Sequence, residues 1–182
     1  QRFTKAIDYF SKAQKLDGNN AEILFNLASA YFLNGWLDES LKLFTQSICL
    51  DPENIDYHYS LAYLYYQKKM YDKALFELDF IQSIEQHHHL SNVLRAMIIA
   101  KNGDLLTAKN QLVSLIKYDD ADDFAYSALS TVYRELSQID LAKDAILKAL
   151  ELNPNSLEYL SELAEIEFMQ KKYDETLKLA DK

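Results

Sequence analysis

Apolar residues recur at intervals of three and four along most of the chain, which is the spacing that keeps side chains on one face of an α-helix. Short polar groups separate these stretches, and such groups end one helix and cap the next. The pattern predicts nine helices, at 21–34, 37–50, 55–68, 71–84, 89–101, 105–117, 123–136, 139–152 and 157–170, bracketed by partial helices at 3–16 and 173–182. The chain contains only three Gly and two Pro, so a sheet-rich fold with many tight reversals is disfavoured.

The helices follow a period of 34 residues. Pro52 and Pro154 lie 102 residues apart, which is three times 34, and Gly35 and Gly103 lie 68 apart, which is twice 34. Helix-breaking residues that recur at a fixed period indicate a repeat protein. The period divides the chain, without insertion or deletion, into a partial repeat at 1–20, full repeats at 21–54, 55–88, 89–122 and 123–156, and an incomplete repeat at 157–182.

Small side chains stand at two fixed positions of each repeat. The eighth position holds Ala28, Ala62, Ala96, Ser130 and Ala164, and the twentieth holds Ala6, Ser40, Ala74, Ala108, Ala142 and Thr176. Small residues at matching positions let two helices approach closely, and bulky residues beside them fill the remaining space. Each repeat is therefore expected to be a pair of closely packed helices, A and B.

On these residues the chain resembles the tetratricopeptide repeat family, whose signature reads W-x2-L-G-x2-Y, then A-x3-F, then P. The match is best in residues 21–54, at Leu24, Leu27, Ala28, Tyr31, Ser40, Phe44 and Pro52, with Leu24 in the place of Trp. The resemblance covers the whole chain and implies an all-α fold, a right-handed α-α superhelix or solenoid whose concave surface is lined chiefly by A helices. Since one repeat cannot bury its apolar face alone, residues 1–182 are expected to form a single stack. The chain begins without Met, which suggests a fragment of a longer protein.

Charge and composition narrow the classes of function. A net charge of −9, from 19 basic and 28 acidic residues, repels phosphate backbones and argues against binding to nucleic acid. The sequence contains no apolar run of about 18 residues and no secretion signal, so no membrane insertion is expected. Cys49 is the single cysteine and excludes an internal disulfide, which slightly favours the cytoplasm without fixing the location.

The motifs give no indication of catalysis. The chain lacks a glycine-rich phosphate loop, a Ser/His/Asp signature and a spaced His/Glu motif, so no active site, cofactor or metal is expected. The run His87–His89 could suggest a metal site, but three consecutive side chains point in different directions, and surface histidines are the expected interpretation. The repeat at 89–122 is atypical, because Asn92 and Arg95 replace the leucines of other repeats; irregular packing and a functional hinge both remain open.

Candidate binding residues follow from the A helices. Their positions two, five, nine and twelve share one helical side and are expected to face the concave groove. The expected lining is Phe25, Ser29, Phe32, Tyr59, Tyr63, Tyr66, Val93, Met97 and Phe124, with an acidic end at Glu158, Glu162 and Glu165. Exposure in a groove and internal packing against neighbouring A helices both remain open for the aromatic residues.

The leading hypothesis is a protein–protein interaction scaffold or adaptor that binds a peptide or helical segment of another protein. An apolar or amphipathic segment with basic flanks would suit an aromatic groove with an acidic end. The alternative is the regulatory or substrate-recruiting part of a larger enzyme whose catalytic domain lies elsewhere. Self-association through uncapped terminal repeats is a further hypothesis.

Overall fold

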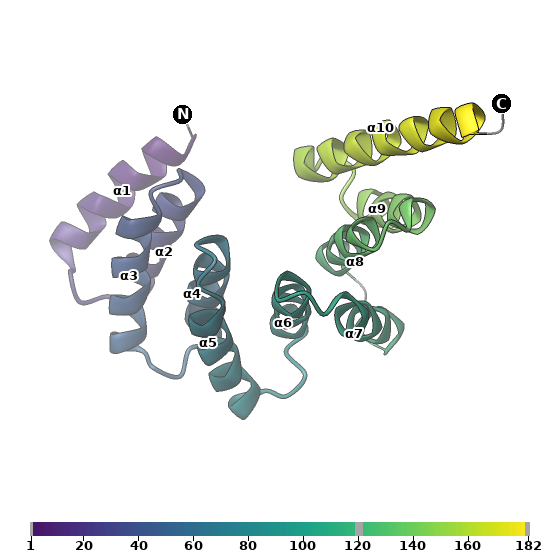
Figure 1. Cartoon of the computed structure of the whole chain (residues 1–182). Helices are drawn as coiled ribbons and strands as arrows, with labels where there is room; N and C mark the ends of the chain where they lie inside the picture. Colours follow the sequence, from purple (N-terminus) through teal and green to yellow (C-terminus); the bar gives the residue numbers. More distant parts are fainter. Residues whose placement is uncertain (1, 119–121, 181–182) are drawn as a thin grey trace. The chain divides into compact units, whose positions relative to one another are not determined.

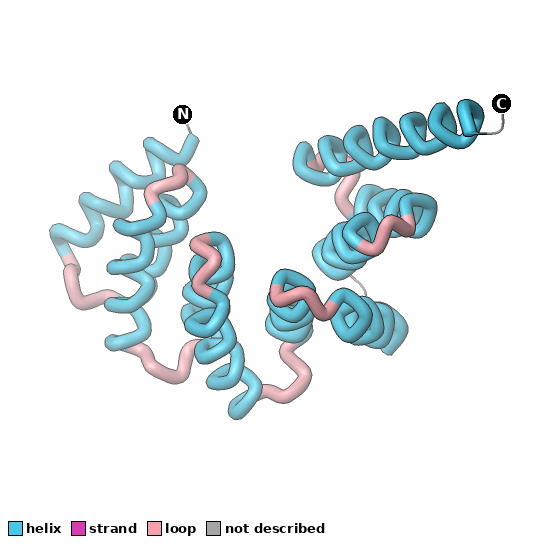
Figure 2. The backbone as a smooth tube through the Cα atoms, in the orientation of Figure 1, coloured by secondary structure: helices cyan, strands magenta, loops and turns pink. Residues whose placement is uncertain are grey.

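A computed structural model describes residues 2–118 and 122–180, and within them all regular structure is helical (Figures 1 and 2). The helices are α1 (Arg2–Leu16), α2 (Ala21–Leu33), α3 (Leu37–Leu50), α4 (Ile55–Gln67), α5 (Tyr71–Ile84), α6 (His89–Lys101), α7 (Leu105–Tyr118), α8 (Asp123–Glu135), α9 (Ile139–Leu152) and α10 (Leu157–Ala180). The predicted ranges are confirmed to within one residue for α1 to α9. The fold is an all-α helical repeat solenoid.

The helices group into two compact units. Unit 1 is Gln1–His88 with α1 to α5, and unit 2 is His89–Lys182 with α6 to α10. The division falls at the predicted start of the atypical repeat. The expectation of one stack over residues 1–182 stays a prediction.

Four of the A helices begin at a side-chain cap, at positions that follow the 34-residue period. Asn20, Asn54 and Asp122 each accept a hydrogen bond from the backbone N–H three residues on, at 3.2, 3.4 and 2.7 Å. Ser156 does the same for Tyr159, at 3.3 Å. Such side chains satisfy backbone donors that the first turn of a helix leaves unpaired. His88 occupies this position before α6, and the turn expected at 119–122 lies largely outside the described residues.

The turn from helix A to helix B also recurs every 34 residues. In each complete repeat one residue adopts a left-handed backbone conformation, namely Gly35 (φ 83°), Lys69 (φ 58°), Gly103 (φ 96°) and Ser137 (φ 60°). The two glycines reach this conformation without steric cost. At Lys69 and Ser137 it costs about 1–2 kcal/mol, and the packing of a full helix B against helix A offsets that cost.

The last repeat departs from the prediction. The helices expected at 157–170 and 173–182 are one continuous helix, α10, up to Ala180 (Figure 1). The equivalent of Gly35 is Lys171, which stays helical, and its neighbours Gln170 and Lys172 are also good helix formers. A lysine favours the helix over a left-handed turn, which would cost free energy. Lys69 and Ser137 make that turn at the same position without glycine, so the residue type alone does not decide between the two. Ala164 is exposed, and no second helix follows α10 within the described residues to cover it.

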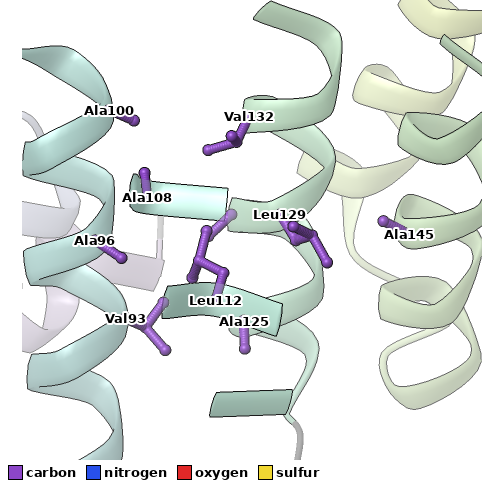
Figure 3. Close-up of a cluster of buried hydrophobic side chains, with 10 residues drawn as sticks. Val93, Ala96, Ala100, Ala108, Leu112, Ala125, Leu129, Val132 and Ala145 are labelled. Carbon is purple, nitrogen blue, oxygen red and sulfur yellow. The ribbon is translucent and has the colours of Figure 1, made fainter. Parts of the chain in front are cut away.

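The predicted packing of small residues is confirmed in the complete repeats. Ala28, Ala62, Ala96 and Ser130 at the eighth position, and Ser40, Ala74, Ala108 and Ala142 at the twentieth, are fully buried. Contact is close enough in unit 1 for the Ser40 hydroxyl of α3 to donate to the carbonyl oxygen of Ala28 in α2, at 2.8 Å. In unit 2, Ala96 of α6, Ala108 and Leu112 of α7 and Val132 of α8 belong to one apolar cluster (Figure 3).

A helix that spans a bilayer needs about 20 consecutive, predominantly apolar residues. Among the helices of the described ranges, none is long and apolar enough to cross a membrane.

Candidate functional site

Three tyrosines on one side of α4 form a row of aromatic rings. Tyr59, Tyr63 and Tyr66 are spaced by four and three residues, and all three are partly buried. The rings of Tyr59 and Tyr63 are 6.5 Å apart between centroids with planes 22° from parallel, and those of Tyr63 and Tyr66 are 6.2 Å apart at 26°. We call these three residues the aromatic row. Phe32 of α2 meets it edge-on, 5.8 Å from Tyr63.

A pocket of about 180 Å³ opens beside this row. Its lining comes from α2, α3 and α4 and consists of Ser29, Phe32, Leu33, Phe44, Tyr59, Ser60 and Tyr63. Phe44 is buried and Leu33 is 57% exposed, so the pocket runs from the core of unit 1 to its surface. The lining contains no charged side chain, and it therefore favours an apolar group.

Phe25, which the helical spacing placed in the groove, packs inside unit 1 instead. It stacks on Tyr57 with 4.6 Å between centroids and lies 5.5 Å from Phe44. The neighbouring Ser29 borders the pocket, and its hydroxyl donates to the carbonyl oxygen of Phe25, at 2.9 Å. Of the two alternatives, Phe25 therefore packs internally, whereas the pocket is lined by Ser29, Phe32, Tyr59 and Tyr63.

In unit 2 the expected lining packs on the core. Val93 is fully buried, because α7 and α8 cover the side of α6 from which it projects, so it offers no surface to a partner (Figure 3). Met97 and Phe124 are partly buried and pack against the same cluster. The groove spacing placed Val93 at the surface, and the smallness of its neighbours Ala96 and Ala125 brings the helices close enough to enclose it.

The three acidic residues expected at the groove end have different surroundings. Glu158 is exposed. Glu165 pairs with Arg134 of α8, with 2.6 Å between Nη1 and Oε2. Glu162 accepts hydrogen bonds from three hydroxyls of α8, those of Ser127 (3.4 Å), Ser130 (3.0 Å) and Thr131 (3.2 Å).

Through these hydrogen bonds Glu162 connects α10 to α8. Burial raises the pKa of Glu162, and the hydroxyls and the charge of Arg134 act in the opposite direction. The ionised form therefore loses more from desolvation than its partners restore. Glu158 and Glu165 are both exposed, Glu165 in its pair with Arg134, and only Glu162 is partly buried.

A polar pair that sequence reasoning missed lies inside unit 1. His58 of α4 places Nδ1 2.6 Å from Oε2 of Glu77 in α5 and Nε2 3.0 Å from the carbonyl oxygen of Pro52. The ring stacks on Phe80, 4.0 Å between centroids. His58 occupies the fourth position of its repeat, where Leu24 stands in the preceding one, so a titratable residue in the place of a leucine is the signal that identifies it.

The equivalent place in the fourth repeat is hollow. Tyr126 takes the position of His58, and Ala145 takes that of Glu77. A pocket of about 440 Å³ results between α8 and α9, lined by Tyr126, Leu129, Tyr133, Leu141, Asp144, Ala145, Leu147, Lys148 and Glu151. Lys148 and Glu151 pair with each other at 2.8 Å.

The three consecutive histidines have separate environments. His87 is exposed, and the ring of His88 lies edge-on to Tyr59, 5.8 Å between centroids. In unit 2, Nε2 of His89 is 3.4 Å from Oδ1 of Asp122. The described part of the chain contains no group of three or more His, Cys, Asp or Glu side chains placed to hold a metal ion.

The geometry is that of a helical repeat protein. Its helices pair at a 34-residue period, left-handed turns join them, and small residues at positions eight and twenty let them pack closely. The family model described as Psidin, N-terminal TPR repeats region matches residues 60–180, and the model described as Tetratricopeptide repeat matches residues 1–55. The chain belongs to the tetratricopeptide repeat family.

Solved structures with the same fold include TTC0263, a thermophilic tetratricopeptide repeat protein of Thermus thermophilus. It has a TM-score of 0.77 and 21% identity, and the match covers 92% of this chain and 91% of that one. In the hetero-tetramer Cut9–Hcn1 of the APC/C, the TM-score is 0.77 at 20% identity over 93% of this chain and 34% of that one. YrrB is described as having an unusual peptide-binding site. Its TM-score is 0.57 at 19% identity, and the match covers 88% of this chain and 82% of that one.

At these identities the solved structures show a shared fold. Tetratricopeptide repeat proteins are generally non-catalytic scaffolds, and the family and fold make this chain a protein-interaction scaffold in the general sense.

Proposed function

We propose that unit 1 binds an apolar or amphipathic segment of a partner protein on the side of α2 and α4 that the family places in its concave groove. One observation carries the proposal, the uncharged pocket of about 180 Å³ beside the aromatic row. An apolar anchor side chain of the partner enters this pocket and contacts Phe32 and Tyr63. Buried aromatic contacts of this kind supply most of the binding energy in peptide interfaces.

Two neighbours in fold support a polypeptide as the ligand. YrrB is described by a peptide-binding site, and Cut9 is described in a complex with Hcn1. The proposal gives this chain no catalytic step of its own. The partner's anchor supplies the free energy of binding, and the pocket fixes the position of the bound segment.

A displayed library of random 16-residue peptides, selected on the 182-residue chain, tests the proposal. Enriched peptides are expected to share an apolar anchor. Their affinity for the Ser60→Leu variant is expected to fall by about tenfold or more, because the leucine fills the pocket while leaving every aromatic residue in place. Phe76→Ala is the matched control, since Phe76 of α5 is 72% exposed in the same unit and lies outside the pocket.

Circular dichroism and thermal unfolding verify that both variants are folded before affinities are compared. If the peptides bind Ser60→Leu as tightly as the original chain, the pocket is not the binding site. The proposal also fails if selection enriches no peptide whose binding depends on Ser60.

A further inference from the structure

The fourth repeat lacks the side chains that fill the corresponding place in the second. In the second repeat the ring of Phe80 stacks on His58, with 4.0 Å between centroids, and Glu77 is hydrogen bonded to the same histidine. Two periods later, Lys148 stands in the place of Phe80 and Ala145 in that of Glu77. Alanine is too short to fill the space, and the pocket of about 440 Å³ between α8 and α9 is the result.

The aromatic wall of this pocket is held in place by the core of unit 2. Tyr126 and Tyr133 of α8 pack against a buried cluster of the unit and also line the pocket. Among the described residues no second ring stacks on Tyr126. Lys148, which takes the place of the stacked ring, is 55% exposed and pairs with Glu151 at 2.8 Å.

The rim of the pocket is more apolar than the same surface of the second repeat. Leu141 and Leu147 stand where the second repeat has Lys73 and Asp79, and they are 46% and 40% exposed. A leucine exposed to water contributes little to stability, whereas its area contributes when a partner covers it. Exposed apolar residues beside a pocket are typical of a binding surface.

One carboxylate gives the pocket an unbalanced negative charge. The charged residues of the lining are Asp144, Lys148 and Glu151. Lys148 and Glu151 pair with each other, whereas Asp144 is exposed and forms no ion pair within the part of the chain that the structure describes. A positively charged group next to an apolar one therefore complements this lining.

We infer that the pocket between α8 and α9 binds an aromatic side chain of a partner protein, and that a neighbouring arginine or lysine of the same segment pairs with Asp144. The ring lies on Tyr126 as Phe80 lies on His58 in the second repeat, and the exposed leucines of the rim contact the segment beside it. Aromatic and arginine side chains are the usual anchors of protein interfaces. This second site belongs to unit 2 and does not depend on the pocket of unit 1.

Peptides selected on a chain whose first pocket is filled test the inference. A displayed library of random 16-residue peptides is selected on the Ser60→Leu variant, with counter-selection on Ser60→Leu/Lys148→Phe. The phenylalanine restores the residue type of the second repeat at an exposed position and is expected to fill the pocket. Enriched peptides are expected to carry an aromatic residue with arginine or lysine within about four positions.

The affinity of each enriched peptide is then measured by calorimetry on the original chain and on Lys148→Phe. It is expected to fall by about tenfold or more in the variant. Loss of a lysine would by itself favour a basic peptide, so weaker binding reports the filled pocket. Lys42→Phe is the matched control, the same exchange at an exposed position of α3. Thermal unfolding verifies that each variant is folded.

A cycle of substitutions in the peptide and the chain tests the pairing with Asp144. Replacement of the peptide's basic residue by glutamine is expected to weaken binding to the original chain by about three- to tenfold. The same replacement is expected to have no effect on binding to the Asp144→Asn variant, because the carboxylate that recognises the charge is absent.

Three outcomes contradict the inference in different ways. If no enriched peptide binds Lys148→Phe more weakly, the pocket is not a docking site, and the proposed function, which depends on Ser60, is unaffected. An equal effect of the glutamine replacement in the original chain and in Asp144→Asn overturns the assigned pairing. Tryptamine that shifts the NMR signals of Tyr126 and Ala145, without any pocket-dependent peptide, overturns a protein ligand in favour of a small molecule.

Discussion

His58 of α4 and Glu77 of α5 are hydrogen bonded inside unit 1, with Nδ1 2.6 Å from Oε2, and their side chains are only 9% and 12% exposed. The other ring nitrogen of His58 faces the carbonyl oxygen of Pro52 at 3.0 Å. Because a carbonyl oxygen can only accept, Nε2 carries the N–H that donates to Pro52, and the hydrogen bond between Nδ1 and Oε2 needs one further proton, on either atom. The pair joins helix A, helix B and the preceding turn of one repeat.

Removal of one partner is expected to destabilise unit 1 more than removal of both. The Glu77→Leu variant leaves a buried ring nitrogen without its hydrogen-bond partner and is expected to lower the free energy of unfolding by about 2–4 kcal/mol. Chemical denaturation of Glu77→Leu, His58→Leu and the double variant gives the coupling energy, expected at about 1–3 kcal/mol. Additive single effects would show that the two side chains do not interact.

The buried position of Glu162 predicts a pH dependence. Its pKa is raised by burial, so the folded state holds a proton at pH values where the unfolded chain has released it. The stability that comes from this proton is complete below the unfolded pKa of about 4.3 and is lost as pH rises through the folded pKa. The free energy of unfolding of Glu162→Gln minus that of the original chain is therefore expected to increase with rising pH in this window.

Denaturation series between mildly acidic and neutral pH measure this difference. Glu158→Gln is the matched control, because it removes one exposed carboxylate from the same helix. A difference for Glu162→Gln that stays constant or decreases with pH would contradict the expected burial of the charge.

The left-handed turns predict effects of opposite sign at two positions. At Gly35 a Cβ atom would meet open space, so Gly35→Ala tests only the backbone conformation, at φ 83°. It is expected to lower stability by about 1 kcal/mol. Lys69→Gly relieves the same strain and is expected to raise stability by about 0.5 kcal/mol after the entropy cost of glycine.

Thermal and chemical unfolding of the two variants measure these effects. Gly103→Ala should repeat the result in unit 2, since its φ is 96° and its Cβ would also meet open space. Equal stability of Gly35→Ala and the original chain would mean that the turn relaxes out of the left-handed region.

The size limit at position twenty can be tested at Ser40. The other complete repeats hold alanine there, so Ser40→Ala should cost at most about 1 kcal/mol, the value of the hydrogen bond to Ala28. Ser40→Val adds volume where α2 and α3 touch and is expected to cost about 1–3 kcal/mol. A variant with valine as stable as the alanine variant would show that the two helices can separate without loss.

The periodic features of the fold were accessible from the sequence because each depends on one position that recurs. The small residues at positions eight and twenty fix the close approach, and Gly35 and Gly103 mark the turns. Lys69 and Ser137 adopt the same backbone conformation, but lysine and serine are not residue types that predict it. The continuous helix α10 was missed for the converse reason, since the apolar spacing of two helices in register is the same as that of one.

The binding residues were less predictable, because exposure depends on how closely helices pack. Helical spacing selected the side of α4 with Tyr59 and Tyr63 and also selected Val93, but only the distance between neighbouring helices separates a pocket wall from a core residue. The partners of Glu162 come from residues 31 to 35 positions earlier, and spacing within one helix contains no information about them.

The unbroken α10 changes how far the fifth repeat extends. Its 24 residues span about 36 Å at 1.5 Å per residue, whereas a hairpin would return the later residues to the level of Leu157. Labels at the two ends of this helix would be separated by a distance that energy transfer between fluorophores resolves. The same sequence pattern can therefore form a helical hairpin when its fifteenth residue adopts a left-handed conformation, or a single long helix when that residue stays helical.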